Sequence, residues 1–536
     1  MRSAGAWIYP LRWWERIIRT TMTYAKVTPV KDDETSQPGI TRRALGGLGV
    51  AAAIAPAFAS AQRTPASGQY RPQVHYAPAK GFMNDPNGLI FHQGEYHLFY
   101  QHNPFEAKAG HVHWGHAVSP DLLRWRELPE ALDVTTAGQA FSGSAVYDRN
   151  NTSGLFRSGA GGLVAIYTRA SDTRQTQEIA TSADRGRTFT PYPGNPVLDV
   201  GSASFRDPKV LWHGPSKRWI MTVVRSREHR VIFYGSPDLK RWEELGSFGH
   251  AGLLGIDYEC PDLVEVPVEG GGTRWVLFVS INPGAPLGGS GVQYFVGSFD
   301  GQRFQAEDGA TRLADFGQDF YALQTYANVD GPPVAIAWMS NWLYCNDVPA
   351  SPSRGAMTLP RRLSLRRRAD DWRLVQVPVP LDPLAGLTIL SGARPKRSGV
   401  IASASLPPGA AVEVALRIEA DPGAVLTVRL SNAAGETLSA SFDAGTYPGF
   451  VIDRGGTRGF RHRYMVDRAI WSATPGTTKT DVRLIVDRTS IELFGMDGEA
   501  SGTMLQYFAS QPDRIDVVAE NGAVALSALN VRSLKP

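Results

Sequence analysis

The chain has 536 residues, of which 43% are hydrophobic and 20% charged, a composition that indicates a globular protein with more than one domain. The formal net charge is +4, but residues 1–61 carry eight Lys or Arg and four Asp or Glu and account for all of it. The remainder is neutral. The charge therefore gives no support for nucleic acid or an anionic membrane as a partner.

The first 61 residues have the features of an export signal. Thr41-Arg42-Arg43 precedes a weakly apolar Gly/Ala run, and Ala59-Ser60-Ala61 offers small residues to a signal peptidase. The paired arginines resemble a twin-arginine signal. Because the run is short, Gly-rich and contains Pro56, we do not expect a membrane anchor. We predict that residues 1–61 form an N-terminal extension and export signal, and that the protein is periplasmic or extracellular.

From Val74 to Trp372 the chain reads as short strands separated by Gly, Pro, Asp and Asn. A Ser-x-Asp turn followed by an aromatic residue recurs every 54 to 63 residues, at Ser119, Ser182, Ser236 and Ser298. One such turn per four-stranded unit is typical of a β-propeller. The length of residues 74–372 suits about five units. A β-sandwich with chance turns is the alternative.

A proline-rich segment follows the repeats. We expect residues 373–385 to form a linker, because Pro378-Val-Pro-Leu-Asp-Pro383 is stiff. Residues 386–536 alternate apolar and polar positions between turns, which predicts a C-terminal β-sandwich. The predicted fold is therefore all-β, a five-bladed β-propeller followed by a β-sandwich.

Only two cysteines occur, Cys260 and Cys345. One bridge between them is possible. An exported protein with so few cysteines is not a disulfide scaffold, and we expect two free, buried thiols.

Three short motifs place a carboxylate beside a proline: Asn84-Asp85-Pro86-Asn87-Gly88, Arg206-Asp207-Pro208 and Glu259-Cys260-Pro261. Asp207 and Glu259 are about one repeat apart, and Asp85 and Asp207 about two. Equivalent positions on different blades converge on the propeller axis, so we expect these acids to share one site. Cleaving a glycosidic bond requires an acid for the leaving oxygen and a second carboxylate at the anomeric carbon.

Each motif alone also has a plain structural interpretation. Asp85 could form an Asx turn, Asp207 a surface ion pair with Arg206, and Glu259 an exposed position on a strand. Six histidines lie between His92 and His116, but their spacing matches no zinc site, so we predict no metal and no cofactor.

Several longer stretches resemble one known family, glycoside hydrolase family 32, the β-fructofuranosidases, and in particular its exo-acting levanases and inulinases. The resemblance is dense over residues 74–372 and looser beyond them. It rests on these stretches: Phe82–Gly88, Tyr100–Pro104, His113–Ala117, Phe141–Ser144, Phe205–Lys209, Tyr258–Asp262, Gly289–Gly297, Asp319–Ala322 and Trp338–Trp342.

The resemblance implies a propeller with a C-terminal sandwich, and a retaining mechanism. Asp85 would be the nucleophile, Glu259 the general acid/base and Asp207 the transition-state stabiliser. The carboxyls of a retaining pair lie about 5 Å apart. The implied sugar-binding residues are Asn84, Gln101, Trp114, Phe141, Ser142, Arg206 and Trp338. Phe82 and Tyr258 replace tryptophans common in relatives, which bears on substrate preference.

We therefore expect an exo-acting enzyme that releases fructose from β-fructans, levan first, and that binds fructan or sucrose. The alternatives are an invertase-like enzyme acting mainly on sucrose, a fructosyltransferase, and a non-catalytic carbohydrate-binding propeller. The last needs no paired acid and nucleophile. The sequence does not indicate an oligomeric state.

Overall fold

The computed structural model describes residues 68–157, 161–369 and 371–535. Their regular structure is β, apart from three short 3-10 helices: η1 (Ser226–Glu228), η2 (Asp382–Leu384) and η3 (Met496–Gly498). No helix in this part of the chain is long and apolar enough to cross a membrane. The predicted export signal at residues 1–61 lies outside the described residues.

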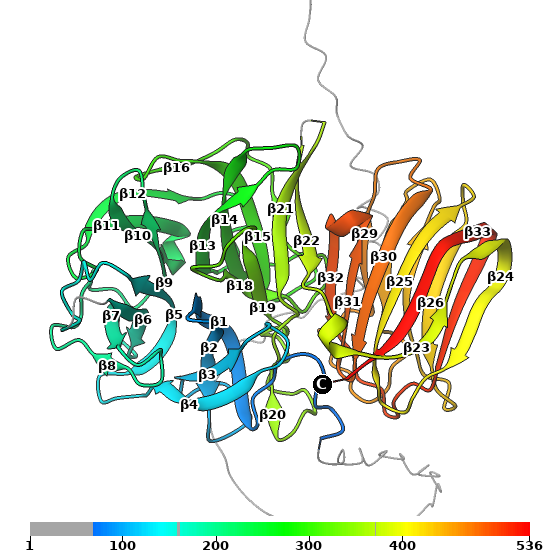
Figure 1. Ribbon diagram of the computed structural model, residues 1–536, viewed down its shortest axis with the longest axis horizontal. Coiled ribbons are helices and arrows are strands. Elements are labelled where there is room, and N and C mark those ends of the chain that lie inside the picture. The colour runs from blue at the N-terminus through cyan, green and yellow to red at the C-terminus, as the bar shows by residue number, and fades with distance from the viewer. Residues whose placement is uncertain (1–67, 158–160, 370, 536) are drawn as a thin grey trace, which may run out of the picture. The chain divides into compact units, whose positions relative to one another are not determined.

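Five antiparallel sheets form a β-propeller (Figure 1). The first blade contains β1 (Gly81–His92), β2 (Glu95–Asn103), β3 (His113–Ser119) and β4 (Arg126–Leu132), with β20 (Ser353–Arg354) parallel to β1. The second blade contains β5 (Gln139–Asp148), β6 (Gly162–Ala170), β7 (Gln175–Ser182) and β8 (Thr190–Pro191). The third blade contains β9 (Phe205–His213), β10 (Arg218–Arg225), β11 (Arg230–Ser236) and β12 (Glu243–Gly249).

The fourth blade contains β13 (Asp257–Pro267), β14 (Thr273–Asn282), β15 (Gly291–Phe299), β16 (Phe304–Ala306) and β17 (Arg312–Leu313). The fifth contains β18 (Tyr321–Thr325), β19 (Val334–Trp338), β21 (Arg361–Arg368) and β22 (Asp371–Pro378). The innermost strands contact one another in a closed ring, β1 with β5, β5 with β9, β9 with β13, β13 with β18, and β18 with β1. This ring confirms the predicted five-bladed propeller.

Apolar side chains pack between neighbouring blades. Val146 and Ile166 of the second blade share a buried cluster with Phe205 and Val223 of the third. Because strands such as β6 are covered on both faces, their sequences are nearly continuous apolar runs rather than alternating ones. The blades thus hold one another in place around the axis.

The Ser-x-Asp turns mark the same point in four blades. Ser119, Ser182 and Ser236 end β3, β7 and β11, and Ser298 lies one residue before the end of β15. The aspartate that follows accepts backbone N–H groups of the turn; Asp238, for example, accepts from residues 240 and 241 at 3.0 and 2.9 Å. In the fifth blade β21 ends at Arg368 and β22 begins at Asp371 without a Ser-x-Asp motif, which explains why only four repeats are visible in the sequence.

Every innermost strand carries a β-bulge at the same level. In each blade two residues of the innermost strand lie opposite a single residue of the second strand. From the first blade to the fifth, these single residues are Gln101, Thr168, Val223, Val279 and Ala337. The bulged pairs are residues 84–85, 141–142, 207–208, 260–261 and 322–323. A bulge bends the strand and redirects its side chains. All three predicted catalytic carboxylates lie at or beside these bulges.

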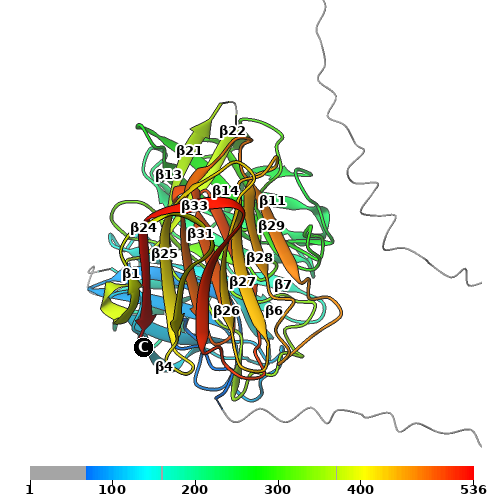
Figure 2. The same cartoon turned by 90° about the vertical axis from the view of Figure 1, so that its right-hand side faces the viewer.

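The C-terminal part is a β-sandwich. Its strands are β23 (Ala385–Ser391), β24 (Arg394–Ser405), β25 (Ala411–Ala420), β26 (Val425–Ser431), β27 (Thr437–Asp443), β28 (Gly449–Asp453), β29 (Arg468–Ser472), β30 (Lys479–Asp487), β31 (Ser490–Gly495), β32 (Ala500–Leu505) and β33 (Arg514–Leu534). The first half of the long β33 pairs with β26 and its second half with β25, so this strand joins the two layers (Figure 2).

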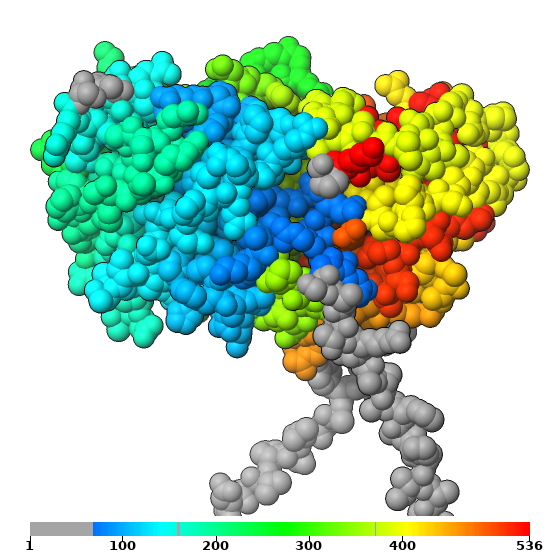
Figure 3. Space-filling view, turned by 60° about the horizontal axis from the view of Figure 1, so that its bottom comes forward, coloured from blue at the N-terminus to red at the C-terminus, as the bar shows by residue number. Residues whose placement is uncertain are grey.

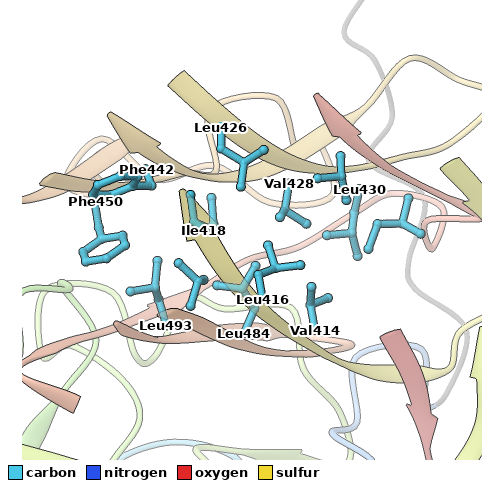
Figure 4. Close-up of a cluster of buried hydrophobic side chains, with 14 of the residues drawn as sticks. Val414, Leu416, Ile418, Leu426, Val428, Leu430, Phe442, Phe450, Leu484 and Leu493 are labelled. Atoms are coloured by element: carbon cyan, nitrogen blue, oxygen red, sulfur yellow. The ribbon is translucent and has the colours of Figure 1, made fainter. Parts of the chain in front are cut away.

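The core of the sandwich lies between these layers. Leu426, Val428 and Leu430 of β26 face Leu416 of β25 and Leu484 of β30 across it (Figure 4). These five side chains are at most 3% exposed. The alternation of apolar and polar residues that predicted the sandwich therefore corresponds to inward and outward positions on its strands.

The expected linker over residues 373–385 is wrong in its first half. Strand β22 pairs with β21 along its whole length, from Arg368 opposite Asp371 to Arg361 opposite Pro378. Residues 373–378 therefore belong to the fifth blade. The connection to the sandwich is short, because η2 begins at Asp382 and β23 at Ala385. Pro378 ends the strand rather than starting a long linker, because proline has no backbone N–H for a further hydrogen bond to the neighbouring strand.

Buried ion pairs join the propeller to the sandwich. Arg454, which follows β28, donates to Asp319 Oδ2 at 2.7 Å and to the carbonyl of Leu505 at 2.7 Å. Arg361 of β21 donates to Asp315 Oδ2 at 3.0 Å and to Thr503 Oγ1 at 2.7 Å. Each charge is paired and hydrogen-bonded, which is the condition under which burial of a charge is tolerated.

The start of the described chain lies between the two domains, where the blue segment separates the cyan blades from the yellow-to-red sandwich (Figure 3). His75 lies here and is fully buried, with Nδ1 2.9 Å from Asp487 Oδ2 and Nε2 3.7 Å from Glu492 Oε1. Burial by itself lowers the pKa of His75, but the contacts with Asp487 and Glu492 outweigh it and raise this pKa to about 9.

We predict that His75 stabilises the protein in a pH-dependent way. Its pKa rises from 6.5 to about 9 on folding, so its contribution, about 3 kcal/mol, is complete below pH 6.5 and is lost as the pH rises through 9. His75→Gln should lower the melting temperature strongly at pH 6 and much less at pH 10. Calorimetry of wild type, His75→Gln and the exposed control His250→Gln tests this. An equal loss at both pH values would contradict it.

Candidate active site

Three side chains occupy the same register position, directly before the bulge, on neighbouring strands. They are Arg206 of β9, Glu259 of β13 and Tyr321 of β18. Arg206 donates to Glu259 Oε1 from Nη2 at 3.0 Å and from Nε at 3.2 Å. The Tyr321 hydroxyl donates to the other oxygen, Oε2. Glu259 is therefore held from both sides by the blades that flank its own.

The bulged residues form a second layer of contacts, next to the layer of Arg206, Glu259 and Tyr321. Asp207 Oδ2 accepts the backbone N–H of Cys260 at 2.9 Å. The Cys260 thiol lies 3.4 Å from Asp85 Oδ2 and 3.7 Å from Asp207 Oδ2, so both carboxylates lie close to one sulfur atom. Asp85 is 7% exposed and Asp207 5% exposed. Side chains from the first, third and fourth blades thus meet on the axis.

Asp85 is fixed by a chain of polar side chains. Ser142 Oγ donates to Asp85 Oδ2 at 2.7 Å, and Asn84 Nδ2 donates to Oδ1 at 3.1 Å. Asn84 Nδ2 also donates to Gln101 Oε1 at 2.8 Å, and Gln101 Nε2 donates to Ser142 Oγ. Both carboxylate oxygens of Asp85 are therefore oriented by neighbours from β1 and β5.

Aromatic side chains surround these polar groups. Trp114 Nε1 donates to the carbonyl of Phe141 at 2.9 Å and so joins β3 to the bulge of β5. On the other side, Trp338 packs against Phe82, Tyr321 and Trp342 at ring-centroid distances of 6.2, 6.3 and 4.9 Å. These rings exclude water beside the carboxylates.

The structure thus brings all ten predicted site residues to one end of the axis. Seven are linked to one another by the contacts above, or to Cys260: Asn84, Asp85, Gln101, Ser142, Arg206, Asp207 and Glu259. Trp114, Phe141 and Trp338 belong to the aromatic surroundings.

The predicted equivalence of the three carboxylates is only approximate. When the blades are aligned on their bulges, Glu259 occupies the position directly before the bulge, as Arg206 does. Asp207 is the first bulged residue, like Asn84 and Cys260, and Asp85 is the second, like Ser142. The acids therefore converge from three successive register positions rather than from one. A spacing of about one or two repeats could not resolve a difference of one or two residues.

The sequence motifs predict no role for Tyr321 or for Thr168, whose hydroxyl accepts the Asp207 N–H at 3.0 Å. Tyr321 lies in the stretch Asp319–Ala322, which resembles the family but contains no carboxylate–proline motif. Tyr321 lies 62 residues after Glu259, about one repeat, and this spacing indicates an equivalent position on the next blade. Cys260 and Cys345 are both free and buried, in agreement with the interpretation of the sequence.

Burial, and then the neighbouring acids, raise the pKa of two of these carboxyls. Burial raises the pKa of Asp85, and the charge on Glu259 raises it further, against the hydrogen bond from Ser142. Burial also raises the pKa of Asp207, to about 7, although Arg206 opposes the shift. The guanidinium of Arg206 faces three carboxylates, Glu259 at 3.0 Å, Asp257 at 3.4 Å and Asp207 at 4.0 Å. A site with this excess of acidic groups is suited to positive charge that develops on a sugar.

The clustered histidines are engaged separately. His97 Nδ1 lies 3.0 Å from His116 Nε2, His102 Nδ1 2.8 Å from Glu130 Oε1, and His113 Nδ1 3.2 Å from Asp133 Oδ1. Among the described residues, no three or more His, Cys, Asp or Glu side chains are grouped so that they could hold a metal ion.

Comparison with known proteins agrees with this architecture. Residues 75–378 match the glycosyl hydrolases family 32 N-terminal domain, and residues 390–533 match the family's C-terminal domain. The chain is 40% identical to a levanase of Bacillus subtilis over 487 residues, which cover 87% of the chain and 70% of the levanase. It is 35% identical to an extracellular exo-inulinase of Meyerozyma guilliermondii over 492 residues, 87% of the chain and 95% of the inulinase.

An invertase of Schizosaccharomyces pombe is 46% identical over 332 residues, but these cover only 60% of the chain and 55% of the invertase. Among solved structures, a β-fructofuranosidase from Schwanniomyces occidentalis complexed with fructosyl-erythritol superposes with a TM-score of 0.83 at 35% identity. It covers 88% of this chain and 99% of its own. The exo-inulinase of Aspergillus awamori gives 0.81 at 32% identity, with 87% and 98% covered.

We predict that Asp207→Asn stabilises the fold at alkaline pH. Because folding raises the pKa of Asp207 to about 7, the protonated carboxyl is tolerated at pH 4 but the ionised one is costly at pH 8. The amide keeps an acceptor for Cys260 N–H and removes the charge. Thermal unfolding should show a melting temperature higher by about 2 °C at pH 8 and unchanged at pH 4. A decrease at pH 8 would contradict this.

Proposed function

The chain belongs to glycosyl hydrolase family 32 and is a fructosidase of that family, and from this we propose that it is an exo-acting fructanase. It releases fructose from the non-reducing end of β-fructans, with levan as its main substrate. One observation carries the proposal. Asp85, Asp207 and Glu259 come from three blades to one end of the axis, where Cys260 and Arg206 connect them.

Asp85 acts as the nucleophile. Its two oxygens are oriented by Ser142 and Asn84, and the surrounding layer leaves little freedom for the side chain. In the first step Asp85 bonds to the anomeric carbon of the terminal fructosyl unit while Glu259 gives its proton to the glycosidic oxygen. The bond to the leaving sugar breaks, and a fructosyl ester of Asp85 remains.

Glu259 acts as general acid and then as general base. In the second step its carboxylate takes a proton from water, the water oxygen bonds to the anomeric carbon, and Asp85 departs as fructose is released. Arg206 and Tyr321 donate to the two oxygens of Glu259, so they stabilise the carboxylate that exists between the steps. The retention of configuration that results is typical of the family.

Asp207 stabilises the transition state. It lies beside Asp85 on the axis, and its Oδ2 is anchored by the backbone of Cys260. Positive charge on the sugar ring favours the ionised form of Asp207, although burial disfavours it in the free site. Of the remaining predicted residues, Asn84, Gln101, Phe141, Ser142 and Arg206 bind the fructosyl unit. Trp114 and Trp338 are fully buried and support these residues.

The choice of levan over sucrose rests on the extent of similarity. The match with the levanase runs through both domains, whereas the match with the invertase covers 332 residues. The higher identity of that shorter match, 46% against 40%, favours sucrose as the second candidate. A non-catalytic carbohydrate-binding propeller has no support, because the matched family models are those of glycosyl hydrolases and the acids lie together.

We also propose that the enzyme is exported. Residues 1–61 supply the paired arginines and small residues of an export signal, and one relative is described as extracellular.

We predict that Asp85→Asn and Glu259→Gln each lower kcat on levan and sucrose at least about 1,000-fold, since each removes a reacting group. Release of fructose by the purified variants measures this. Glu520→Gln, which neutralises an exposed carboxylate of the sandwich, serves as the matched control and keeps full activity. Unchanged fructose release by both active-site variants would disprove the assignment.

We predict that fructose is the only early product from levan and inulin, because an exo-acting enzyme removes one terminal unit per cycle. Chromatography of products in the first few per cent of conversion checks this. Early oligosaccharides would show internal cleavage, and activity on sucrose alone would favour the invertase-like alternative.

A further inference from the structure

The loop between β2 and β3, residues 104–112, lies at the catalytic end of the propeller. It leaves β2 shortly after Gln101 and enters β3 just before Trp114, and both of these residues belong to the site. Gln101 is the residue that faces the bulge of β1, which carries Asp85. The connection between the strands therefore begins and ends beside the fructosyl site.

Contacts with the segment after β19, with β20 and with β5 hold this loop in place. Its Ala109 N–H donates to Asn346 Oδ1 at 2.9 Å, and Arg354 donates to the carbonyl of Ala107 at 2.9 Å. At its other end the carbonyl of Val112 accepts the N–H of Ala140, at the start of β5, at 2.9 Å. Ala109 also packs against the aromatic cluster that includes Trp338. The loop thus borders the site from the second blade to the fifth.

Phe105 projects from this loop with 76% of its surface exposed. Its backbone is nevertheless fixed, because Asn103 Oδ1 accepts the Phe105 N–H at 3.1 Å and Asn103 Nδ2 donates to the carbonyl of Lys108 at 2.8 Å. The rings of His113 and His111 lie edge-on to it, with centroids at 5.7 and 6.4 Å. An exposed aromatic on a rigid backbone, grouped with other rings, indicates a binding surface.

We propose that Phe105, flanked by His111 and His113, is a stacking platform for a fructosyl residue on the leaving-group side of the scissile bond. The inference rests on the proposed fructanase function and adds a second contact region to it. The apolar face of a furanose ring stacks on Phe105. The exposed His111 imidazole lies beside it as a hydrogen-bonding partner for the sugar hydroxyls, whereas His113 is buried next to Asp133 and supports the Phe105 ring.

The position of Phe105 implies selectivity for longer substrates. Phe105 follows Gln101 by four residues, so the chain places it at most about 14 Å away, and less because the loop turns at Asn103. A fructan continues past the cleaved bond and reaches this distance, whereas sucrose ends with one hexose. Binding energy from Phe105 is therefore available to fructans and largely unavailable to sucrose.

The ratio of kcat/KM for a β-(2,6)-linked fructotetraose to that for sucrose tests the platform. Phe105→Ala should lower this ratio about tenfold, the effect of losing one aromatic contact. Phe105→Trp should restore it. The matched control is Tyr447→Ala, which removes an aromatic residue that is 78% exposed on the sandwich and should leave the ratio unchanged.

The outcomes separate the two proposals. If wild type cleaves the tetraose and Phe105→Ala keeps the wild-type ratio, the platform is wrong and the fructanase proposal stands. If Phe105→Ala lowers both values equally, the residue only supports the loop and the platform is again wrong. If wild type cleaves sucrose but no fructan, the proposed function itself is overturned and the platform with it.

Discussion

The site depends on one repeated backbone feature, the β-bulge at the same level of all five innermost strands. In a regular strand alternate side chains point to opposite faces, toward the two neighbouring blades. One extra residue interrupts this alternation and turns side chains toward the axis. Asp207, Cys260 and Ala322, the first bulged residues of the third, fourth and fifth blades, have φ of 66°, 47° and 53°. Such conformations cost about 1–3 kcal/mol each in residues other than glycine and persist where the surroundings enforce them.

The cost of this backbone is offset by the bonds that it makes possible. With Cys260 in the left-handed region, its N–H is directed at the Asp207 carboxylate and its thiol lies between Asp85 and Asp207. The same arrangement crowds acidic groups around a single guanidinium. Burial, together with the charges of the neighbouring acids, disfavours their ionised forms and raises the pKa values of Asp85 and Asp207. A cationic transition state relieves this repulsion, so strain in the free protein becomes stabilisation of the reacting sugar.

The sequence contained enough to predict the architecture because its repeats are local. Ser-x-Asp turns form within a few residues, and their spacing counts the blades without knowledge of long-range contacts. The motifs around Asp85, Asp207 and Glu259 likewise predict cleavage of a glycosidic bond. The bulge register was not predictable, since it depends on which residue of β10 or β14 pairs across the sheet. Long-range pairing also determines the contact between Tyr321 and Glu259 and the end of the fifth blade at Pro378, so the sequence alone predicts neither.

The sandwich contributes to the site through the strand that carries Tyr321. Asp319 and Gln318 immediately precede β18, and both accept hydrogen bonds from Arg454 of the sandwich, at 2.7 and 2.5 Å. Asp319 also accepts the Leu505 N–H at 2.8 Å, so both Arg454 and Leu505 of the sandwich bind the segment before β18. Two residues further on, Tyr321 donates to Glu259. Because arginine, carboxylate and backbone are all buried here, the start of β18 cannot shift without breaking charged hydrogen bonds. The sandwich therefore braces the blade that positions the hydroxyl beside Glu259.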